Sequence, residues 1–144
     1  MTPSTIGLVQ ESHGWVVPIA EPAAELFYKR LFETAPEVKP LFKGDMKEQG
    51  RKLMATIAVV VNALDRLESV LPAVKALAIR HVDYGVRDEH YDKVGAALLW
   101  TLQAGLGNRF TEAHRTAWLE AYTALSGVMR TEVAAAKAAK AGAA

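Results

Sequence analysis

The stretch that decides the fold is residues 70–95, VLPAVKALAIRHVDYGVRDEHYDKVG. The apolar side chains of Val70, Val74 and Leu77 follow the spacing of a single helical face, and His81 continues that face one turn later. The pattern therefore predicts a helix that points a titratable imidazole in the same direction as its core residues.

Helical periodicity extends over nearly the whole sequence, and no run alternates apolar and polar residues for long enough to indicate a strand. Asp88 and Thr111 are candidate N-caps of the last two helices, and Gly85 is a candidate left-handed terminator. The helices are expected at about 4–19, 21–35, 46–65, 70–84 and 89–106 and after Thr111, with a short helical turn at about 36–42. The sequence thus predicts one all-α domain over residues 1–144, whose alanine-rich end, about 133–144, extends the last helix and frays.

The composition excludes several classes of protein. Hydrophobic residues make up 51% and charged residues 23% of the chain, which excludes a disordered protein and is ordinary for one that folds by itself. The 17 basic and 16 acidic residues nearly cancel, and no basic cluster is interleaved with aromatic residues, so no nucleic-acid partner is expected. The absence of cysteine removes disulfides and thiolate metal sites.

Nothing in the sequence indicates export or a membrane span. The start, MTPSTIGLVQESHGW, lacks the basic region and the long apolar run of a signal peptide. The longest apolar run, residues 57–61, is far shorter than the roughly 20 residues that cross a bilayer. We therefore expect a cytoplasmic protein with no membrane partner.

Three helices place a polar side chain in line with their apolar residues: Tyr28, Gln49 and His81. Each alone has an ordinary explanation, as a satisfied core histidine, a tyrosine with a buried ring, or a solvated amide in a first turn. Together they indicate an apolar pocket with one imidazole and two hydrogen-bonding groups, which suits a flat apolar cofactor that carries a metal. One neutral imidazole can be the axial ligand of haem iron, because the macrocycle supplies the in-plane ligands.

The other histidines, His13, His90 and His114, are interpreted as surface or boundary residues. None of them combines an apolar helical stripe with facing polar partners, and no HExxH or CxxC spacing indicates a zinc site. A serine hydrolase is also disfavoured, because the sequence has no GxSxG motif and no sheet to carry one.

With these residues in view, the chain resembles a bacterial single-domain globin, similar to the haemoglobin domains that stand alone or begin flavohaemoglobins. The resemblance covers about residues 5–132. The segments that carry it are LFYKRLFETAPEVKPLF (26–42), QGRKLM (49–54), RHVDYGVRDEHYDKVG (80–95) and AWLEAY (117–122). Within them, six residues stand in the order and spacing of the family: Tyr28, Pro36, Phe42, Gln49, His81 and Tyr91. The resemblance implies the globin fold, a three-over-three helical sandwich around a haem.

The resemblance also implies the residues that hold haem b, iron protoporphyrin IX. His81 would be the proximal ligand of the iron, and Phe42 would pack against the porphyrin. Arg51 and Lys52 are near enough in sequence to approach a haem propionate, although a solvated helix face explains them equally well. Four residues would complete the cofactor site, the last three along the proximal half: Val86, Tyr91, Val94 and Leu98.

On the distal side, the resemblance places Tyr28 and Gln49 where they stabilise a bound gas, with Leu53 shaping the space around it. Hydrogen-bond donors favour oxygen over carbon monoxide, because bound oxygen takes on negative charge. The pair therefore implies tight oxygen binding, with O2, NO and CO as possible ligands.

One position departs from the family. In relatives with a strengthened proximal histidine, a glutamate of the last helix pairs with the imidazole, whereas Val133 falls in that register here and Glu132 is one residue away. A carboxylate partner would raise the basicity of the imidazole. The displacement argues against peroxidase-like behaviour.

The expected function is oxygen binding, used for transport or for nitric oxide dioxygenation. Dioxygenation would need an external reductase, because these residues contain no Gly-rich dinucleotide-binding motif. The alternatives are a gas sensor that signals through a partner protein and a cofactor-free helical interaction domain. The oligomeric state is left open between monomer and homodimer.

Overall fold

Helices make up nearly all of the protein in a computed structural model, which describes residues 1–83 and 85–143, with side chains described up to residue 82 and from 85 to 139. The α-helices are α1 (Pro3–Val16), α2 (Ala20–Thr34), α3 (Met46–Asn62), α4 (Leu71–Asp83), α5 (Asp88–Leu106) and α6 (Glu112–Ala143). Four short 3₁₀ helices connect them: η1 (Val17–Ile19), η2 (Pro36–Leu41), η3 (Leu64–Ser69) and η4 (Gly107–Arg109). No strand occurs among the described residues, so the all-α prediction is confirmed.

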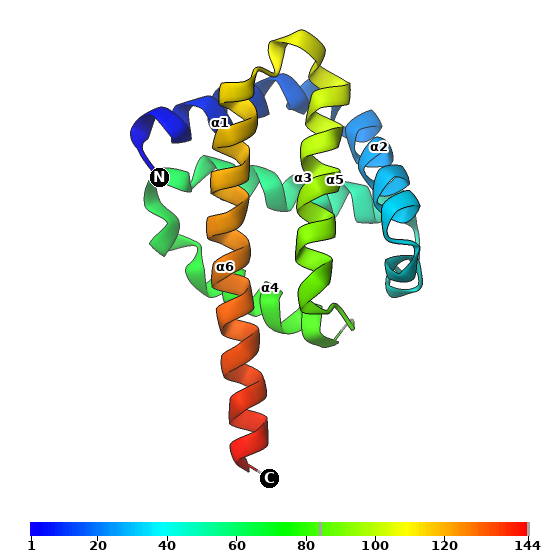
Figure 1. Ribbon diagram of the computed structural model, residues 1–144, viewed down its shortest axis with the longest axis vertical. Helices are drawn as coiled ribbons and strands as arrows, with labels where there is room; N and C mark the ends of the chain where they lie inside the picture. Colours follow the sequence, from blue (N-terminus) through cyan, green and yellow to red (C-terminus); the bar gives the residue numbers. More distant parts are fainter. Residues whose placement is uncertain (84, 144) are drawn as a thin grey trace.

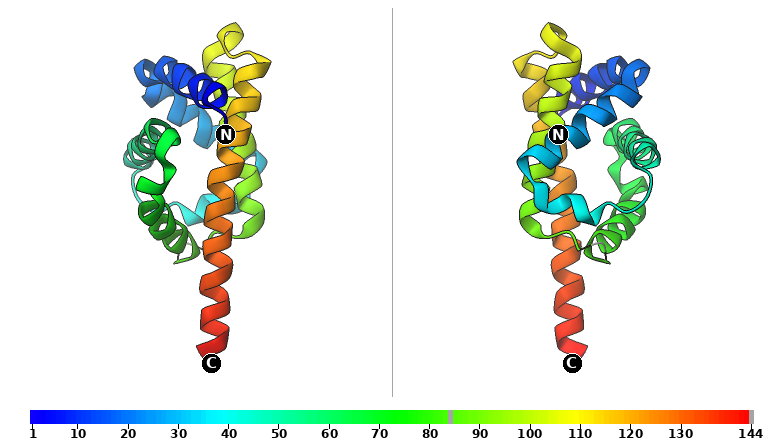
Figure 2. Two further views of the ribbon diagram at one scale, coloured as in Figure 1. Left: turned by 90° about the vertical axis from the view of Figure 1, so that its left-hand side faces the viewer. Right: turned by 90° about the vertical axis from the view of Figure 1, so that its right-hand side faces the viewer.

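The helices form two layers. Figure 1 shows α5 and α6 side by side, with α3 crossing behind them. Figure 2 shows α3 and α4 on one side of the molecule and α5 and α6 on the other, while α1 and α2 lie across one end. The most extensive contacts are those of α2 with α5, α4 with α6, α1 with α6 and α2 with α3. This arrangement confirms the predicted three-over-three helical sandwich.

The core is divided into three parts. The main core joins α1, α3, α5 and α6, and inside it the Trp118 indole donates a hydrogen bond to the Ser12 hydroxyl at 2.7 Å. The second part, here called the α2 cluster, consists of Phe27, Tyr28, Leu31, Ala35, Val38 and Ala97. The third, the α4 cluster, consists of Val74, Ala78, Tyr91 and Met129. Of the residues that the sequence singled out, the α2 cluster contains Tyr28 and the α4 cluster contains Tyr91.

The predicted element boundaries hold with small differences. The helix expected at 46–65 ends at Asn62, and η3 continues the chain toward α4. Gly85 has φ +89°, as expected of a left-handed terminator, while the neighbouring residue 84 lies outside the described part. Asp88 is the first residue of α5 rather than its N-cap, which is Arg87. Thr111 precedes α6, and its hydroxyl accepts a bond from the His114 N–H at 3.4 Å.

The interpretation of the other histidines as surface or boundary residues was wrong. His13, His90 and His114 are only 8%, 4% and 5% exposed. His90 and His114 each stand third in a helix, where Nδ1 accepts a hydrogen bond from the backbone N–H of Arg87 (3.0 Å) or Thr111 (3.1 Å). These bonds satisfy a ring nitrogen at a helix start, so the imidazole can be buried there.

The last helix is much longer than the others. α6 has 32 residues, and its alanine-rich end continues as helix to Ala143 and projects beyond the other elements (Figure 1). Neither α6 nor any other helix of the described chain is both long and apolar enough to cross a membrane.

The crossing of α5 and α6 depends on a glycine. A Cβ at Gly95 would lie 2.7 Å from Cε2 of Tyr122, and the Tyr122 hydroxyl donates a hydrogen bond to the carbonyl of Tyr91. Gly95→Ala is expected to lower the free energy of unfolding by about 1–3 kcal/mol, because the tyrosine ring must shift in a packed crossing. Denaturant unfolding of the variant measures this loss.

Gly127→Ala in α6 is the matched control for that experiment, because a Cβ there has no other atom within 4 Å in the described structure. Since alanine favours helix over glycine, this substitution is expected to raise stability by about 0.5–1 kcal/mol. Equal effects of the two substitutions would contradict the close packing of Gly95 against Tyr122.

Candidate functional site

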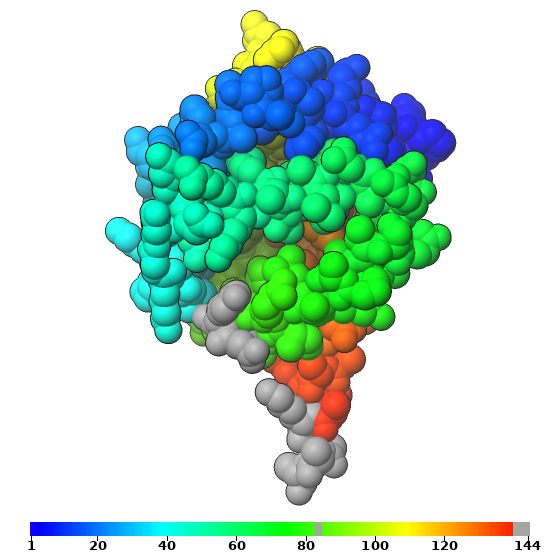
Figure 3. Space-filling view, turned by 180° about the vertical axis from the view of Figure 1, so that it is seen from behind, coloured from blue at the N-terminus to red at the C-terminus, as the bar shows by residue number. Residues whose placement is uncertain are grey.

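A hollow opens between α3 and α4. Figure 3 shows it between these two helices, with α5 and α6 visible at its floor. The helices around it, α3, α4 and α5, carry apolar side chains that are only half-buried: Leu53, Ile57, Leu77, Val94 and Leu98. A closed core would cover such side chains, since exposed apolar area is unfavourable. The hollow therefore has the lining that a flat apolar cofactor would cover.

His81 stands in the last turns of α4 on the face that carries Val74 and Leu77. Its Nδ1 lies 2.8 Å from the Leu77 carbonyl oxygen, and because a carbonyl can only accept, Nδ1 carries the proton. Burial lowers the pKa of the imidazole below its usual value; the Leu77 bond opposes this shift and the charge of Arg80 adds to it. The ring is therefore neutral near pH 7 with its lone pair on Nε2, the form that ligates a metal.

Tyr91 brings α5 to the same place. Its ring faces that of His81 with the centroids 6.4 Å apart and the planes 19° from parallel. The side chain is only 7% exposed, yet its hydroxyl has no hydrogen-bond partner among the described residues. Burial raises the pKa of this phenol, so it stays protonated. An unpartnered buried donor close to His81 is a second sign that the site is built to hold a further group.

The expected departure on α6 has a structural counterpart. Val133 packs against the α4 cluster, so the side chain that faces the proximal region from this turn is apolar. Glu132 is half-buried, and its carboxylate does not bond to the Tyr91 hydroxyl, which lacks any described partner. The proximal side therefore has no glutamate–tyrosine hydrogen bond.

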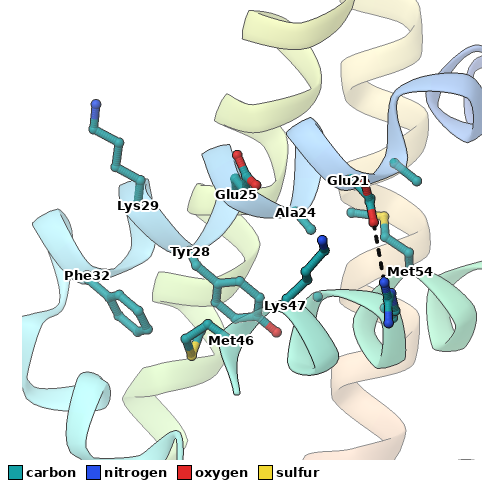
Figure 4. Close-up of a pocket in the computed structure, with 12 residues that line it drawn as sticks. Glu21, Ala24, Glu25, Tyr28, Lys29, Phe32, Met46, Lys47 and Met54 are labelled. Atoms are coloured by element: carbon teal, nitrogen blue, oxygen red, sulfur yellow. Dashed lines mark ion pairs between the residues drawn. The ribbon is translucent and has the colours of Figure 1, made fainter. Parts of the chain in front are cut away.

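Tyr28 lies in the middle of an aromatic group on the opposite side of the hollow. Its ring is 5.3 Å from that of Phe42 and 5.9 Å from that of Phe32, measured between centroids. Its hydroxyl points toward α3, as Figure 4 shows, and donates a 3.3 Å bond to the backbone carbonyl of Gln49. Burial raises the pKa of this phenol to about 12, so it is a hydrogen-bond donor throughout the physiological range.

The structure thus brings Tyr28 and Gln49 together, but through the backbone of Gln49. The side-chain amide of Gln49 donates instead to the Lys43 carbonyl at 3.3 Å, in the loop before α3. Both bonds are long, so either donor can turn toward the hollow at small cost. Leu53 follows one turn later on α3 and packs against the α2 cluster.

The three remaining lining residues divide between the two sides. Val86 packs against the α4 cluster, which contains Tyr91. Val94 and Leu98 pack instead against the α2 cluster, on the side of Tyr28. The reason is the direction of α5, which starts beside His81 at Tyr91 and carries its later turns toward α2. Their expected place along the proximal half of a haem pocket stays a prediction.

The two candidate propionate partners differ. Arg51 is exposed and lies 3.8 Å from Glu21 and 3.7 Å from Glu48, which directs it toward α2. It also lines a cavity of about 560 Å³ between α2 and α3, and a dashed line in Figure 4 marks the ion pair at Glu21. Lys52 is exposed on α3. Of the two, Lys52 is the better candidate to reach a propionate.

Arg130 is a residue that sequence reasoning missed. It lies on α6 over the ring of Tyr91, and it bonds to the side chain of Asp92 at 2.9 Å. The sequence signal for it was the pair Asp88 and Asp92, whose i, i+4 spacing puts both carboxylates on one face at the start of α5. Two like charges on one face indicate that a neighbouring helix supplies a cation.

Comparisons with known protein sequences point to one family. The globin family model matches residues 25–129. A flavohemoprotein of Rhodopirellula baltica is 32% identical over 131 residues, which cover 89% of this chain and 32% of that protein. A flavohemoprotein of Chromobacterium violaceum is 35% identical over 106 residues, which cover 72% of this chain and 26% of that protein. The chain spans about a third or less of the length of these curated relatives.

Solved structures agree with the sequences. A bacterial globin from Campylobacter jejuni superposes with a TM-score of 0.83 and 30% identity, over 94% of this chain and 99% of that one. An engineered carbene transferase, described as a "putative nitric oxide dioxygenase" from Rhodothermus marinus, superposes with a TM-score of 0.89 and 26% identity, over 98% and 99% of the two chains.

Proposed function

The chain belongs to the globin family, and from that premise we propose that it holds haem b through His81 and binds oxygen tightly for reaction with nitric oxide. The observation that carries the proposal is the neutral imidazole of His81, whose Nδ1 is tied to the Leu77 carbonyl beside an apolar hollow. Globin and flavohemoprotein relatives imply haem binding, and the identity of the haem as haem b belongs to the proposal.

The residues on the two sides of the hollow are proposed to act differently on a bound haem. Haem, when bound, supplies an iron that binds small gases. His81 holds the cofactor from the proximal side through Nε2, while the Leu77 bond fixes the ring and its tautomer. The apolar surface of the haem would be covered, and water excluded from the hollow, by the side chains of Leu53, Val94 and Leu98. Phe42 packs beside Tyr28 and limits where a planar group can lie.

Tyr28 and Gln49 supply the donors on the distal side. Their hydroxyl and amide stabilise a ligand with partial negative charge, and an apolar surrounding strengthens such bonds relative to water. Tyr28 keeps its proton, because burial raises its pKa to about 12. Together the two donors favour slow loss of oxygen.

Slow loss of oxygen suits a nitric oxide dioxygenase better than a carrier, which must release its cargo. The overall conversion joins one NO and one O2 into nitrate and consumes one electron. No Gly-rich dinucleotide-binding motif occurs in these 144 residues, so the proposed reductant is a donor outside them. The flavohemoprotein relatives and the nitric oxide dioxygenase named among the structures support this use.

A single-turnover experiment tests the proposal. The purified protein is loaded with haem, reduced, oxygenated and mixed with NO in a stopped-flow instrument. One nitrate per haem and complete conversion to the ferric spectrum are expected, with NO consumed much faster than oxygen dissociates. Oxygen loss that outpaces the reaction with NO would favour carriage, and failure to take up haem would overturn the proposal as a whole.

A further inference from the structure

The guanidinium of Arg130 lies over the ring of Tyr91. Its guanidinium carbon lies 5.2 Å from the centroid of the Tyr91 ring, within the range of a cation–π contact. On its other side the guanidinium reaches α5 at three points: Nη2 to Asp92 Oδ1 (2.9 Å), Nη2 to the Asp88 carbonyl (3.1 Å) and Nε to Asp88 Oδ1 (3.3 Å). The side chain therefore links α6 to the first two turns of α5.

This network differs from an ordinary surface ion pair. The Arg130 side chain is 31% exposed, whereas both aspartates are largely exposed, so the guanidinium lies deeper than its partners. The hydrogen bond that Arg130 donates to the Asp92 carboxylate is the main reason that the pKa of Arg130 is raised. Hydrogen bonds to the Asp92 carboxylate and the Asp88 carbonyl, with the ion pair to Asp88 beside them, restrict the guanidinium more than a single exposed pair would.

The Tyr91 ring packs in the α4 cluster with Val74, Ala78 and Met129, which bury it but offer its hydroxyl no hydrogen bond. Its hydroxyl has no described hydrogen-bond partner, so the far end of the ring is not anchored. Tyr122 bonds only to its backbone carbonyl. Two further groups face the ring itself: the Arg130 guanidinium lies over it, and the His81 ring is nearly parallel to it.

We propose that Arg130 is a positioning residue of the proximal side: held by Asp88 and Asp92, it fixes the Tyr91 ring against His81 and so limits the rotation of the imidazole. This inference rests on the proposed function of His81 as the haem ligand. It assigns to this chain a proximal support based on a cation, in a region where Val133 supplies no carboxylate. A cation at this place gives the imidazole orientation without the added basicity that a carboxylate would give.

The first test replaces Arg130 with Met, which keeps an apolar stem of similar length, and with Lys, which keeps the charge. Arg115→Met, at an exposed arginine of the same helix, is the control. In the reduced haem protein, Arg130→Met is expected to broaden and shift the iron–histidine stretching band, while Arg130→Lys restores part of the wild-type band and Arg115→Met leaves it unchanged. A cation–π contact at a partly exposed site predicts a two- to fivefold change, roughly, in the fraction of molecules with the ring in place.

A second variant separates positioning from charge. Asp88→Ala with Asp92→Ala keeps the cation but removes the two carboxylates that hold it, leaving only the backbone carbonyl of residue 88. If Arg130 positions the ring, this variant broadens the band as Arg130→Met does, although the two substitutions change the local charge in opposite directions. If the two variants instead shift the iron–histidine band and the haem reduction potential in opposite directions, and neither broadens the band, Arg130 acts only through its charge. That result would overturn the proposal.

A readout without haem distinguishes this inference from the proposed function. The protein is labelled with fluorotyrosine, and the Tyr91 resonance is assigned with Tyr91→Phe. Arg130→Met is expected to move and sharpen that resonance as the ring gains freedom, even in protein that has taken up no haem. Absence of a Soret band would refute the role of His81 alone, whereas an unchanged Tyr91 resonance and an unchanged band would refute the role of Arg130.

Discussion

Replacement of His81 with glycine is expected to abolish the Soret band of the haem-loaded protein, and imidazole added to the solution is expected to restore it. The substitution removes the ring whose Nδ1 bonds to the Leu77 carbonyl and which is proposed to ligate the iron, while the half-buried apolar side chains remain. Loss of a group that merely supports a metal ligand costs about 10–100-fold in affinity, so loss of the ligand itself should cost more. Haem titration followed by absorbance measures the change.

His114→Ala is the control for that substitution. His114 is also a buried histidine, but it bonds to Glu11 at 2.9 Å and to Thr111 at the start of α6, in contact with α1. Its loss is expected to lower the melting temperature and to leave the Soret band in place. A band that survives in His81→Gly without imidazole would show that another residue holds the cofactor.

The helical face of His81 could be predicted because the information is local. Val74, Leu77 and His81 are spaced by helical turns, and the helix that carries them needs no knowledge of distant residues. Gly85 was predictable for the same reason, since a positive φ after a helix end is a backbone requirement that glycine meets. The order of the helices and the all-α class followed from the same periodicity.

Features that depend on pairing between helices could not be predicted. The burial of His90 and His114 comes from hydrogen bonds at helix starts, and an isolated histidine gives no sign of them. The amide of Gln49 lies on the expected face but bonds to the Lys43 carbonyl, because the loop before α3 comes within its reach. The contact of Arg130 with Tyr91 joins residues of two helices whose crossing is set by Gly95.

Tyr28→Phe is expected to speed oxygen dissociation by about ten- to a hundredfold, because a hydrogen bond to a charged group contributes roughly 1.5–3 kcal/mol. Dissociation of carbon monoxide should change little, since that ligand takes on little charge. Since burial raises the pKa of the phenol from 10.0 to about 12, the wild-type oxygen off-rate should also be constant from neutral pH to about pH 10. Stopped-flow displacement of oxygen by carbon monoxide measures both quantities.

The control removes a phenolic hydroxyl elsewhere in the fold. Tyr122→Phe loses the bond to the Tyr91 carbonyl at the α5–α6 crossing, on the proximal side, and should leave the oxygen off-rate nearly unchanged. If Tyr28→Phe also leaves it unchanged, the bond from its hydroxyl to the Gln49 carbonyl persists when gas is bound, and the distal role of Tyr28 is wrong. If both substitutions speed dissociation equally, the effect comes from loosened helix packing, because only Tyr28 lies on the side of the hollow where the donor is proposed to act.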